Sequence, residues 1–425
     1  MSCPLFLARL LIRTRLANWL PSVRRLVDGG GSFLRYYSDR TVTSPVLELK
    51  AAARLLERHA CDAVNLAMGE PHFDLLPSGS TKLPADQRGW PSPNGLPELR
   101  TAVAEKLHSD NGLTVHPHDE VLITHGATGA FYTALDTFVD PGDKVVLFDP
   151  TSPLFALAAK HRRARVRWIN TWMEDGRTRF RLAHVARALR GAKMLILNTP
   201  ANPTGGVLTL DDLEQIAWWA NRHDVLIYSD EVFERYQYEG EHISIAFLPQ
   251  AGQRTLTVSS LSKGHALAAA RVGWLAGCRH LVRPCAVTAA LQSPFVPTLC
   301  QQIGLTALQQ ESKYFEPIRA GFEYRRRYAF ERLQAMGLNP SWPGGGFFLW
   351  MPVWDRDMSG EVFADRLLRE KKLLVTPGDL FGPSGKGYVR LSFATEDGRL
   401  REGLRRLAEF VDPQNAASTP AKQAA

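Results

Sequence analysis

Residues 255–277 read TLTVSSLSKGHALAAARVGWLAG. One apolar run opens this stretch and ends on Ser260, another closes it, and the segment between them contains Lys263 and Arg271. Short apolar runs bounded by turn residues predict buried strands. The stretch therefore predicts two strands joined by a connection that carries chemically active side chains.

Similar runs alternate with helical patterns over residues 118–277. This alternation predicts a parallel α/β sheet, and continuous apolar runs are expected where helices cover both of its faces. We therefore predict one large α/β sheet of seven strands. These are VLIT (121–124), KVVLF (144–148), ARVRWI (164–169), KMLILN (193–198), VLIYSD (225–230), TLTVSS (255–260) and VGWLAG (272–277).

The composition is that of a folded protein. Of the 425 residues, 45% are hydrophobic and 22% are charged, a balance typical of globular domains. No run of 18 or more apolar residues lacks a charge, which argues against a membrane-spanning helix. The five cysteines are scattered without a CxxC pair, which excludes a disulfide framework and a zinc ribbon.

The formal net charge of +8 is concentrated at the N-terminus, because residues 1–27 contain five arginines and no acid. The remainder is too weakly basic to indicate nucleic-acid binding. Residues 1–36 mix apolar side chains with spaced arginines, as mitochondrial presequences do. A surface helix and a wrongly assigned start remain alternatives. We expect a cytoplasmic protein, or a mitochondrial one if residues 1–36 are a presequence.

Polar groups follow four of the predicted strands, at the sheet edge where ligands bind in open α/β folds. The turn at Gly126–Thr128 starts a helix, whose N-terminus with Arg271 can hold a phosphate. Lys263 can form a Schiff base with an aldehyde, and Asp230 offers a carboxylate. Asn202 follows another strand. An aldehyde, a phosphate and a ring nitrogen are the three features by which proteins bind pyridoxal 5′-phosphate.

With these residues in view, the chain resembles the class I/II aminotransferases, which are fold type I pyridoxal-phosphate enzymes. The resemblance covers about residues 43–412 and rests on motifs that occur in the family's order. They are NPTG (202–205), SDEVF (229–233), SLSK with an arginine eight residues on (260–271), PGGGFFLW (343–350) and YVRLSFA (388–394).

The resemblance implies a role for each matched residue. Lys263 would hold the cofactor aldehyde and move the substrate proton, and Asp230 would pair with the pyridinium nitrogen. Asn202 would donate to the ring oxygen O3′, and Gly69 and Arg390 would lie at the substrate carboxylate. The phosphate would be held by Gly126, Ala127, Thr128, Ser260 and Arg271. Plainer roles remain open for Asp230 as a helix cap and for Asn202 as a turn residue.

Three expected aromatic residues differ from the family's pattern. Phe233 stands where a tyrosine is usual, and Ser152 stands where an aromatic residue usually stacks on the cofactor ring. Trp90 replaces a tyrosine that reaches the cofactor phosphate across a dimer interface, and its indole N–H can still donate. These changes affect the expected substrate and reaction more than the expected cofactor.

The resemblance implies a large cofactor-binding domain at residues 75–305, with a seven-stranded, mostly parallel sheet. A smaller α/β domain would be formed by residues 38–74 and 306–412. We expect a leader at residues 1–37 and a disordered tail at residues 413–425. The family forms homodimers with active sites at the interface, so a homodimer is expected.

The implied function is transfer of an amino group from an amino acid to a 2-oxo acid by a ping-pong mechanism, with no metal. A pyridoxal-phosphate-dependent lyase or cyclase on the same scaffold is the first alternative. A non-catalytic regulator that binds the cofactor is the second. The side chain of the substrate is not defined by any residue placed here.

Overall fold

The computed structural model describes residues 62–71, 89–354 and 358–411. The predicted leader and tail lie outside these residues. The described helices of at least eight residues are α4 (Pro97–Asn111), α5 (Gly126–Phe138), α6 (Pro153–His161), α7 (Leu182–Leu189), α8 (Leu210–Arg222), α10 (Arg279–Gln292), α11 (Thr298–Gln309), α12 (Glu311–Ala335), α13 (Gly360–Lys371) and α14 (Asp397–Val411).

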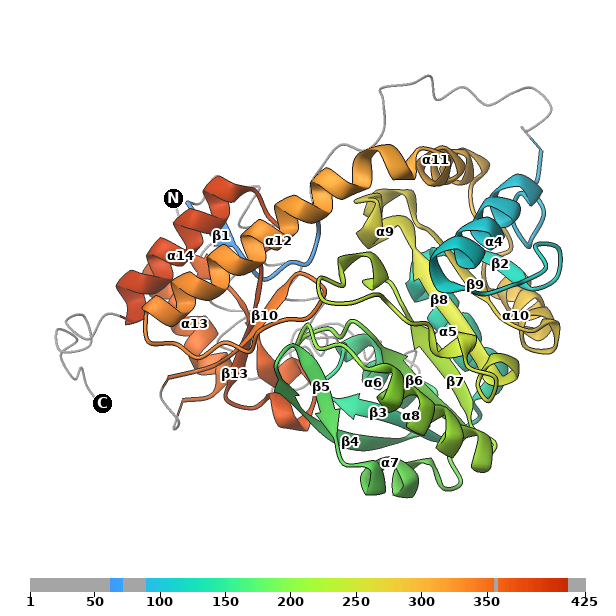
Figure 1. The fold of residues 1–425 in the computed structure, drawn as a ribbon, viewed down its shortest axis with the longest axis horizontal. Coiled ribbons are helices and arrows are strands. Elements are labelled where there is room, and N and C mark those ends of the chain that lie inside the picture. The colour runs from blue at the N-terminus through green and yellow to red at the C-terminus, as the bar shows by residue number, and fades with distance from the viewer. Residues whose placement is uncertain (1–61, 72–88, 355–357, 412–425) are drawn as a thin grey trace, which may run out of the picture.

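All seven predicted strands form, in one sheet of order β2-β9-β8-β7-β6-β3-β4-β5 (Figure 1). Strands β8, β7, β6, β3 and β4 pair in parallel, and β9 is antiparallel to both of its neighbours. Its strands are β2 (Val121–His125), β3 (Lys144–Asp149), β4 (Arg165–Glu174), β5 (Arg177–Phe180), β6 (Met194–Asn198), β7 (Leu226–Asp230), β8 (Thr255–Ser260) and β9 (Val272–Ala276).

The predicted strand count was wrong by one, because β5 extends the sheet as an antiparallel hairpin partner of β4. Its sequence, RTRF, alternates polar and less polar residues at a partly exposed edge. A search for continuous apolar runs finds strands that are buried on both faces, so it passes over an edge strand of this kind.

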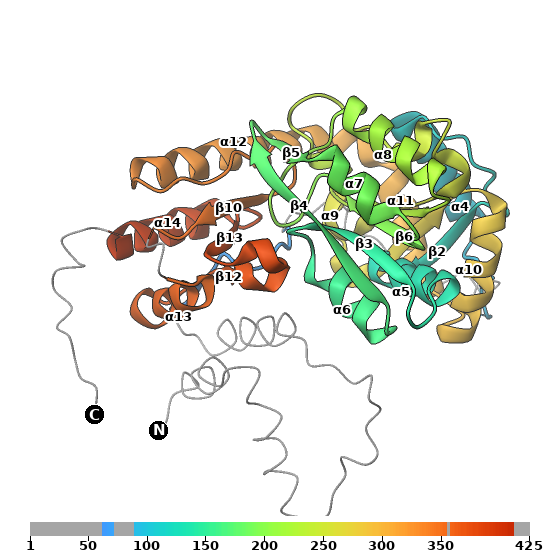
Figure 2. The ribbon, with the colours of Figure 1, turned by 90° about the horizontal axis from the view of Figure 1, so that it is seen from below.

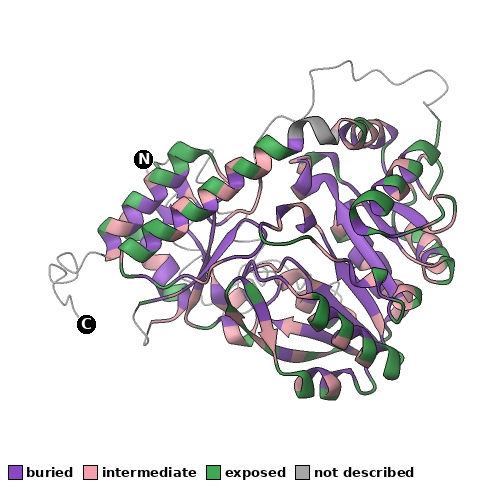
Figure 3. Cartoon of the chain, in the orientation of Figure 1, coloured by how far each residue is buried: buried purple, intermediate pink, exposed green. Residues whose placement is uncertain are grey.

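Helices cover both faces of the large sheet, as the apolar strands predict. Apolar side chains of α5, α6 and α10 pack on one face and those of α7 and α8 on the other. Within β7, Tyr228 points into the first of these layers and Ile227 into the second. Figure 2 shows α5 and α6 on the opposite side of the sheet from α7 and α8, and Figure 3 shows the strands buried between them.

A second, smaller set of elements lies beside the large sheet. An antiparallel sheet of order β10-β13-β12 packs with α12, α13 and α14 around a separate apolar core. Near it, β1 pairs in parallel with β11. The strands are β1 (Val64–Asn65), β10 (Phe348–Pro352), β11 (Leu373–Leu374), β12 (Thr376–Pro377) and β13 (Tyr388–Ser392). The predicted domain boundaries stay a prediction.

Contacts between glycine-rich segments join the two parts of the molecule. The amide of Gly345 donates to the carbonyl oxygen of Gly205 at 2.8 Å. Gly205 has a positive φ of 71°, and a Cβ atom there would lie 2.4 Å from Pro343. The close approach of the two backbones therefore requires glycine at position 205.

No helix in the described ranges is long and apolar enough to cross a membrane.

Candidate active site

The parallel strands bring the predicted site residues to one edge of the large sheet. Asn198 and Asp230 are paired at the ends of β6 and β7, and Asp230 pairs in turn with Val258, two residues before the end of β8. Ser260 ends β8. The candidates gather because parallel strands end at the same edge.

Four of the residues expected to bind the phosphate lie together at the start of α5, namely Gly126, Ala127, Thr128 and Arg271. Arg271 donates from Nη2 to the carbonyl oxygen of His125 at 3.1 Å, directly before the helix. Gly126 has a φ of +68°, and a Cβ atom there would lie 2.5 Å from Nη2 of Arg271. The first-turn residues Ala127 and Thr128 carry backbone N–H groups of the kind that a helix leaves unpaired. Together these groups form a positively charged site that suits an anion.

Gly273 is a contributor that the sequence analysis missed. A Cβ atom at this position would lie 2.6 Å from the backbone carbon of Gly126 and 2.8 Å from the amide nitrogen of Ala127. Only glycine therefore lets β9 pass so close to the start of α5. Its position two residues after Arg271, inside a strand pattern, was the available signal.

Asp230 is a buried carboxylate with few partners. Its Oδ1 accepts from the amide of Val232 at 3.2 Å, and no ion pair joins it to another described residue. Burial raises the pKa of Asp230 to about 7, against the opposing effects of the Val232 amide and Lys263. The element that follows Asp230 is the short 3-10 helix η4 (Glu234–Tyr236), which begins after Phe233, so the hydrogen bond of Asp230 closes a turn and does not cap a helix.

Lys263 lies in the short helix α9 (Leu261–Gly264) that follows β8. Its Nζ donates to the carbonyl oxygen of Gly69, and it lies 5.8 Å from the ring centroid of Phe347. The hydroxyl of Tyr236 donates to the carbonyl oxygen of Lys263 at 3.0 Å, which fixes the backbone of this residue. The structure thus brings together Lys263 and Gly69, which are 194 positions apart in the sequence.

Arg390 is a buried cation on β13. Its Nη1 donates to Oδ1 of Asn202 at 2.6 Å, and its Nη2 donates to the carbonyl oxygen of Ala67 at 2.7 Å. Its guanidinium carbon lies 4.2 Å from the centroid of Phe348 and 4.9 Å from that of Phe381.

This guanidinium retains unused binding capacity. Within the described residues Nε of Arg390 has no hydrogen-bond partner, and no carboxylate forms an ion pair with the side chain. Burial lowers the pKa of Arg390 to about 9. A buried cation in this state favours an anionic ligand, since a carboxylate would offset the cost of removing the charge from water.

Three further residues from the sequence analysis take different places. Trp90 is 86% exposed, and its ring packs against Phe295 with centroids 5.0 Å apart. Phe233 is buried against Phe347 and Phe348. Ser152 directly precedes α6. The described contacts do not join Trp90 to the other candidates.

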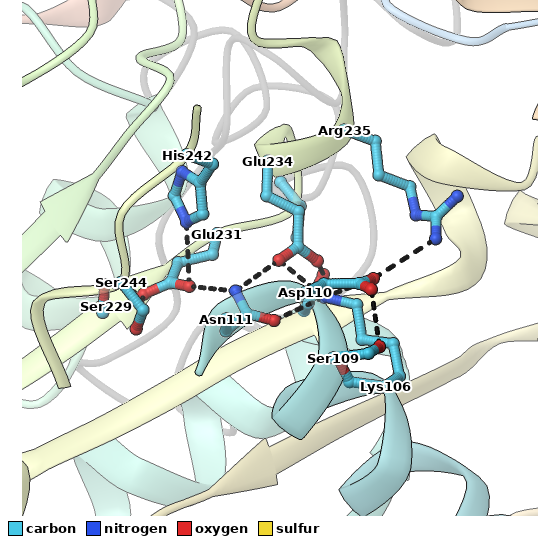
Figure 4. A network of polar contacts seen from close by, with 12 residues as sticks. Lys106, Ser109, Asp110, Asn111, Ser229, Glu231, Glu234, Arg235, His242 and Ser244 are labelled. Carbon is cyan, nitrogen blue, oxygen red and sulfur yellow. Dashed lines mark hydrogen bonds and ion pairs between the residues drawn. The ribbon is translucent and has the colours of Figure 1, made fainter. Parts of the chain in front are cut away.

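The sequence analysis did not predict a buried polar network that contains Glu231, the residue next to Asp230 in the chain (Figure 4). Glu231, the next residue, accepts hydrogen bonds from the hydroxyls of Ser229 and Ser244 at 2.7 and 2.8 Å. It also contacts Asn111 at 3.2 Å and His242 at 3.0 Å. Because Glu231 directly follows Asp230, these contacts also fix the backbone next to Asp230.

Lys106 provides the positive charge in this network. Its Nζ lies 2.6 Å from Oε2 of Glu234, which also accepts from Asn111 at 2.7 Å. Burial alone would raise the pKa of Glu234, but Lys106, His242 and these hydrogen bonds hold it at about 2. Glu231, Glu234 and His242 are close enough to share a metal ion. Because Lys106 already compensates Glu234, we assign no metal site to them.

Comparison with known proteins identifies the chain. Residues 62–407 match the family described as Aminotransferase class I and II. The chain belongs to this family. Its members are pyridoxal-phosphate-dependent transferases, and the chain is an aminotransferase of this class. The family expected from the motifs is therefore confirmed.

Several relatives are similar along most of their length. The aspartate aminotransferase of Pyrococcus abyssi is 32% identical over 358 residues, which cover 82% of this chain and 92% of that protein. The aspartate/prephenate aminotransferase of Thermus thermophilus is 33% identical, over 87% and 96% of the two chains. The Thermus thermophilus aspartate aminotransferase structure with maleate has a TM-score of 0.79 at 31% identity, covering 88% of this chain and 99% of that one.

The residues at the sheet edge are chemically suited to pyridoxal phosphate. Only Oδ1 of Asp230 accepts a hydrogen bond from the described residues, which leaves Oδ2 as a possible acceptor for a protonated ring nitrogen. Arg271 and the start of α5 suit the phosphate. Lys263 lies half-buried after the neighbouring strand, with an amine that suits an aldehyde.

Replacing Lys106 with methionine should reverse the pH dependence of stability. In the wild type the pKa of Glu234 is depressed from 4.5, so the stability from this pair is present above about pH 4.5 and is lost as the pH falls toward 2. In Lys106→Met, Glu234 is left buried without its cation, and we expect a loss of about 3–5 kcal/mol at neutral pH. Without Lys106, burial should raise the pKa of Glu234 above 4.5, so protonation should return part of this stability as the pH falls below neutral.

Thermal unfolding of the wild type and of Lys106→Met, followed from neutral pH down to about 4.5, measures the effect. Lys371→Met is the matched control, because Lys371 pairs with Glu409 on the surface, where such a pair contributes about 0–1 kcal/mol. Equal pH profiles for the two variants would contradict the prediction.

Proposed function

We propose that this aminotransferase holds pyridoxal 5′-phosphate on Lys263 and transfers amino groups between amino acids and 2-oxo acids by a ping-pong mechanism. The observation that carries the proposal is Arg390, a buried cation with an unused N–H donor close to the segment that contacts Lys263. An amine for the cofactor and a cation for a carboxylate then both contact residues 67–69, since Arg390 donates to the carbonyl oxygen of Ala67 and Lys263 to that of Gly69.

When bound, the cofactor supplies an electron sink that stabilises negative charge at the substrate Cα. Asp230 would keep the ring nitrogen protonated, and a positive ring would lower the raised pKa of this carboxylate. Arg271, Ser260 and the first-turn amides of α5 would bind the phosphate. The amine of Lys263, once free, would carry the proton from Cα.

Arg390 and Asn202 would act as a unit at the substrate carboxylate. Asn202 accepts from Nη1 of Arg390, which sets the plane of the guanidinium and ties it to the segment after β6. The side-chain Nδ2 of Asn202 would then be available to donate to the ring oxygen O3′. Gly69 leaves room beside these groups, since a Cβ atom there would lie 2.5 Å from Phe348.

The relatives guide the choice of substrates to test. Their names record activity on aspartate, on aspartate or prephenate, and on aromatic amino acids. The ring of Phe348 packs against the guanidinium of Arg390 at 4.2 Å, so the candidate carboxylate site has an aromatic neighbour. We therefore propose aspartate and the aromatic amino acids as the first candidates for this chain.

A lyase or cyclase reaction is the second candidate, because Phe233 and Ser152 alter the expected surroundings of the ring. One assay separates the two reactions. An aminotransferase needs a 2-oxo acid to regenerate the cofactor after one turnover, whereas a lyase releases oxo acid and ammonia without an acceptor.

Replacing Lys263 with alanine should abolish turnover. The wild type, treated with borohydride, should carry reduced cofactor on residue 263, as detected by peptide mass spectrometry, and should react with L-aspartate or L-phenylalanine plus 2-oxoglutarate. The variant should lose the label and at least about 10³-fold in kcat, since nucleophilic and general-base roles are removed together. Lys160→Ala, at an exposed lysine on α6, is the control. Retained turnover in Lys263→Ala would refute the assignment.

We also propose that the chain works as a homodimer and that Trp90 serves the site of the partner subunit. Three apolar side chains are strongly exposed in this region: Trp90 at 86%, Leu291 at 84% and Val287 at 63%. Leu291 and Val287 are four residues apart on α10, so they share one face of that helix. A second copy would cover them.

The mass of the holoenzyme in solution should be twice the chain mass of 47.3 kDa. Trp90→Ala should weaken cofactor binding by about 10-fold or more, because an N–H donor to a charged phosphate is removed. Trp172→Ala, at a half-exposed tryptophan on β4, should leave binding unchanged. Unchanged cofactor affinity in Trp90→Ala would count against the role of Trp90, and a monomeric mass would count against the dimer.

A further inference from the structure

The segment at residues 378–385, between β12 and β13, covers one side of Arg390. It contains two short 3-10 helices, η8 (Gly378–Phe381) and η9 (Pro383–Gly385). The ring of Phe381 lies 4.9 Å from the guanidinium carbon of Arg390 and packs edge-on against Trp350 at 5.7 Å. Phe381 is therefore one of the two aromatic rings that enclose the guanidinium.

This segment is tied to the end of β3, on the large sheet. The carboxylate of Asp149 accepts from the amide of Ser384 at 3.0 Å and from its hydroxyl at 2.6 Å. The amide of Thr151 donates to the carbonyl oxygen of Phe381 at 2.9 Å. The segment that carries the Phe381 ring is thus held at two points, the carbonyl oxygen of Phe381 and the amide and hydroxyl of Ser384.

The attachment is buried and closely packed. Asp149 is fully buried. Burial raises its pKa above the ordinary value, and the hydrogen bonds from Ser384 offset only part of this rise. Between the two anchoring points lies Gly382, with a φ of +134°, where a Cβ atom would lie 2.3 Å from Oδ1 of Asp149. A buried carboxylate needs such donors, so the contact is costly to leave unmade.

We propose that Asp149 and Ser384 are positioning residues for the substrate α-carboxylate. They hold Phe381 against Arg390, which keeps the guanidinium oriented and shielded from water, where its attraction for a carboxylate is stronger. This inference rests on the proposed function, since it assumes that Arg390 binds the carboxylate.

The expected kinetic effect follows from the position of the carboxylate. It is not altered in the reaction, so its interaction with Arg390 is similar in the bound substrate and in the transition state. Weakening that interaction raises KM and leaves kcat nearly unchanged. Ser384 is the better residue to change, because Asp149 lies on the same segment as Ser152, which is expected near the cofactor ring.

The experiment uses the wild-type holoenzyme and the variants Ser384→Ala and Ser384→Thr, with L-aspartate or L-phenylalanine, whichever is turned over faster. Loss of a hydrogen bond to a charged group should raise the KM of Ser384→Ala for the amino acid about 10-fold, and kcat should stay within about twofold of the wild-type value. Ser384→Thr, which keeps the hydroxyl, should restore KM. Ser359→Ala removes a serine cap from α13 in the same part of the molecule and should leave KM unchanged.

Hydrogen–deuterium exchange gives a readout that does not depend on activity. Peptides covering residues 378–385 should exchange faster in Ser384→Ala than in the wild type or Ser359→Ala. Asp149→Asn is the second variant. Like Ser384→Ala, it should exchange faster over residues 378–385 and have a higher KM than the wild type.

Each outcome decides between the two proposals. Unchanged KM in both Ser384→Ala and Asp149→Asn, with an active wild type, would overturn the positioning role and leave the proposed function intact. A fall in kcat without a rise in KM would also overturn it. If the wild type itself transfers no amino group, the proposed function fails, and the positioning role fails with it.

Discussion

The candidate site depends on two buried charges, Asp230 and Arg390, that form no ion pair within the described residues. Burying an ionised group costs free energy unless an opposite charge or several hydrogen bonds compensate it. The protein meets part of this cost with the Val232 amide and with the oxygen of Asn202. In the proposed function the ligands would supply the rest, a cationic ring for Asp230 and an anionic carboxylate for Arg390.

The network of Lys106, Glu231 and Glu234 shows the opposite arrangement. These groups are as deeply buried, but each has a partner of complementary charge or several donors from the chain itself. Their compensation is complete without a ligand, which is why we assign them to support and not to catalysis. The shift in pKa alone does not separate the two cases, because Glu234 and Asp230 are both strongly shifted. What separates them is whether the chain supplies the partner.

The sequence predicted the elements that carry local signals. The seven strands were found because strands covered on both faces are continuously apolar. The family motifs singled out Lys263, Asp230 and Arg390, and the roles of these residues stay a prediction. The edge strand β5 was missed because it is partly exposed and polar. The support behind Asp230 was missed for another reason: Asn111 is 120 positions from Glu231, and only the packing of α4 brings them together. Gly273 was missed because its effect lies in a steric contact with Gly126.

The arrangement of the two sheets explains why Arg390 needs additional contacts to hold its position. Asp230 is the last residue of β7 and Lys263 follows the neighbouring strand β8, so the backbone ladder sets their spacing. Arg390 belongs to the other sheet, and its position relative to the lysine depends on contacts between the two parts. Asn202 with Arg390 and Gly205 with Gly345 are two of these contacts, and Asp149 with Ser384 is a third. Because the third contact also places Phe381, it affects both the position and the surroundings of the guanidinium.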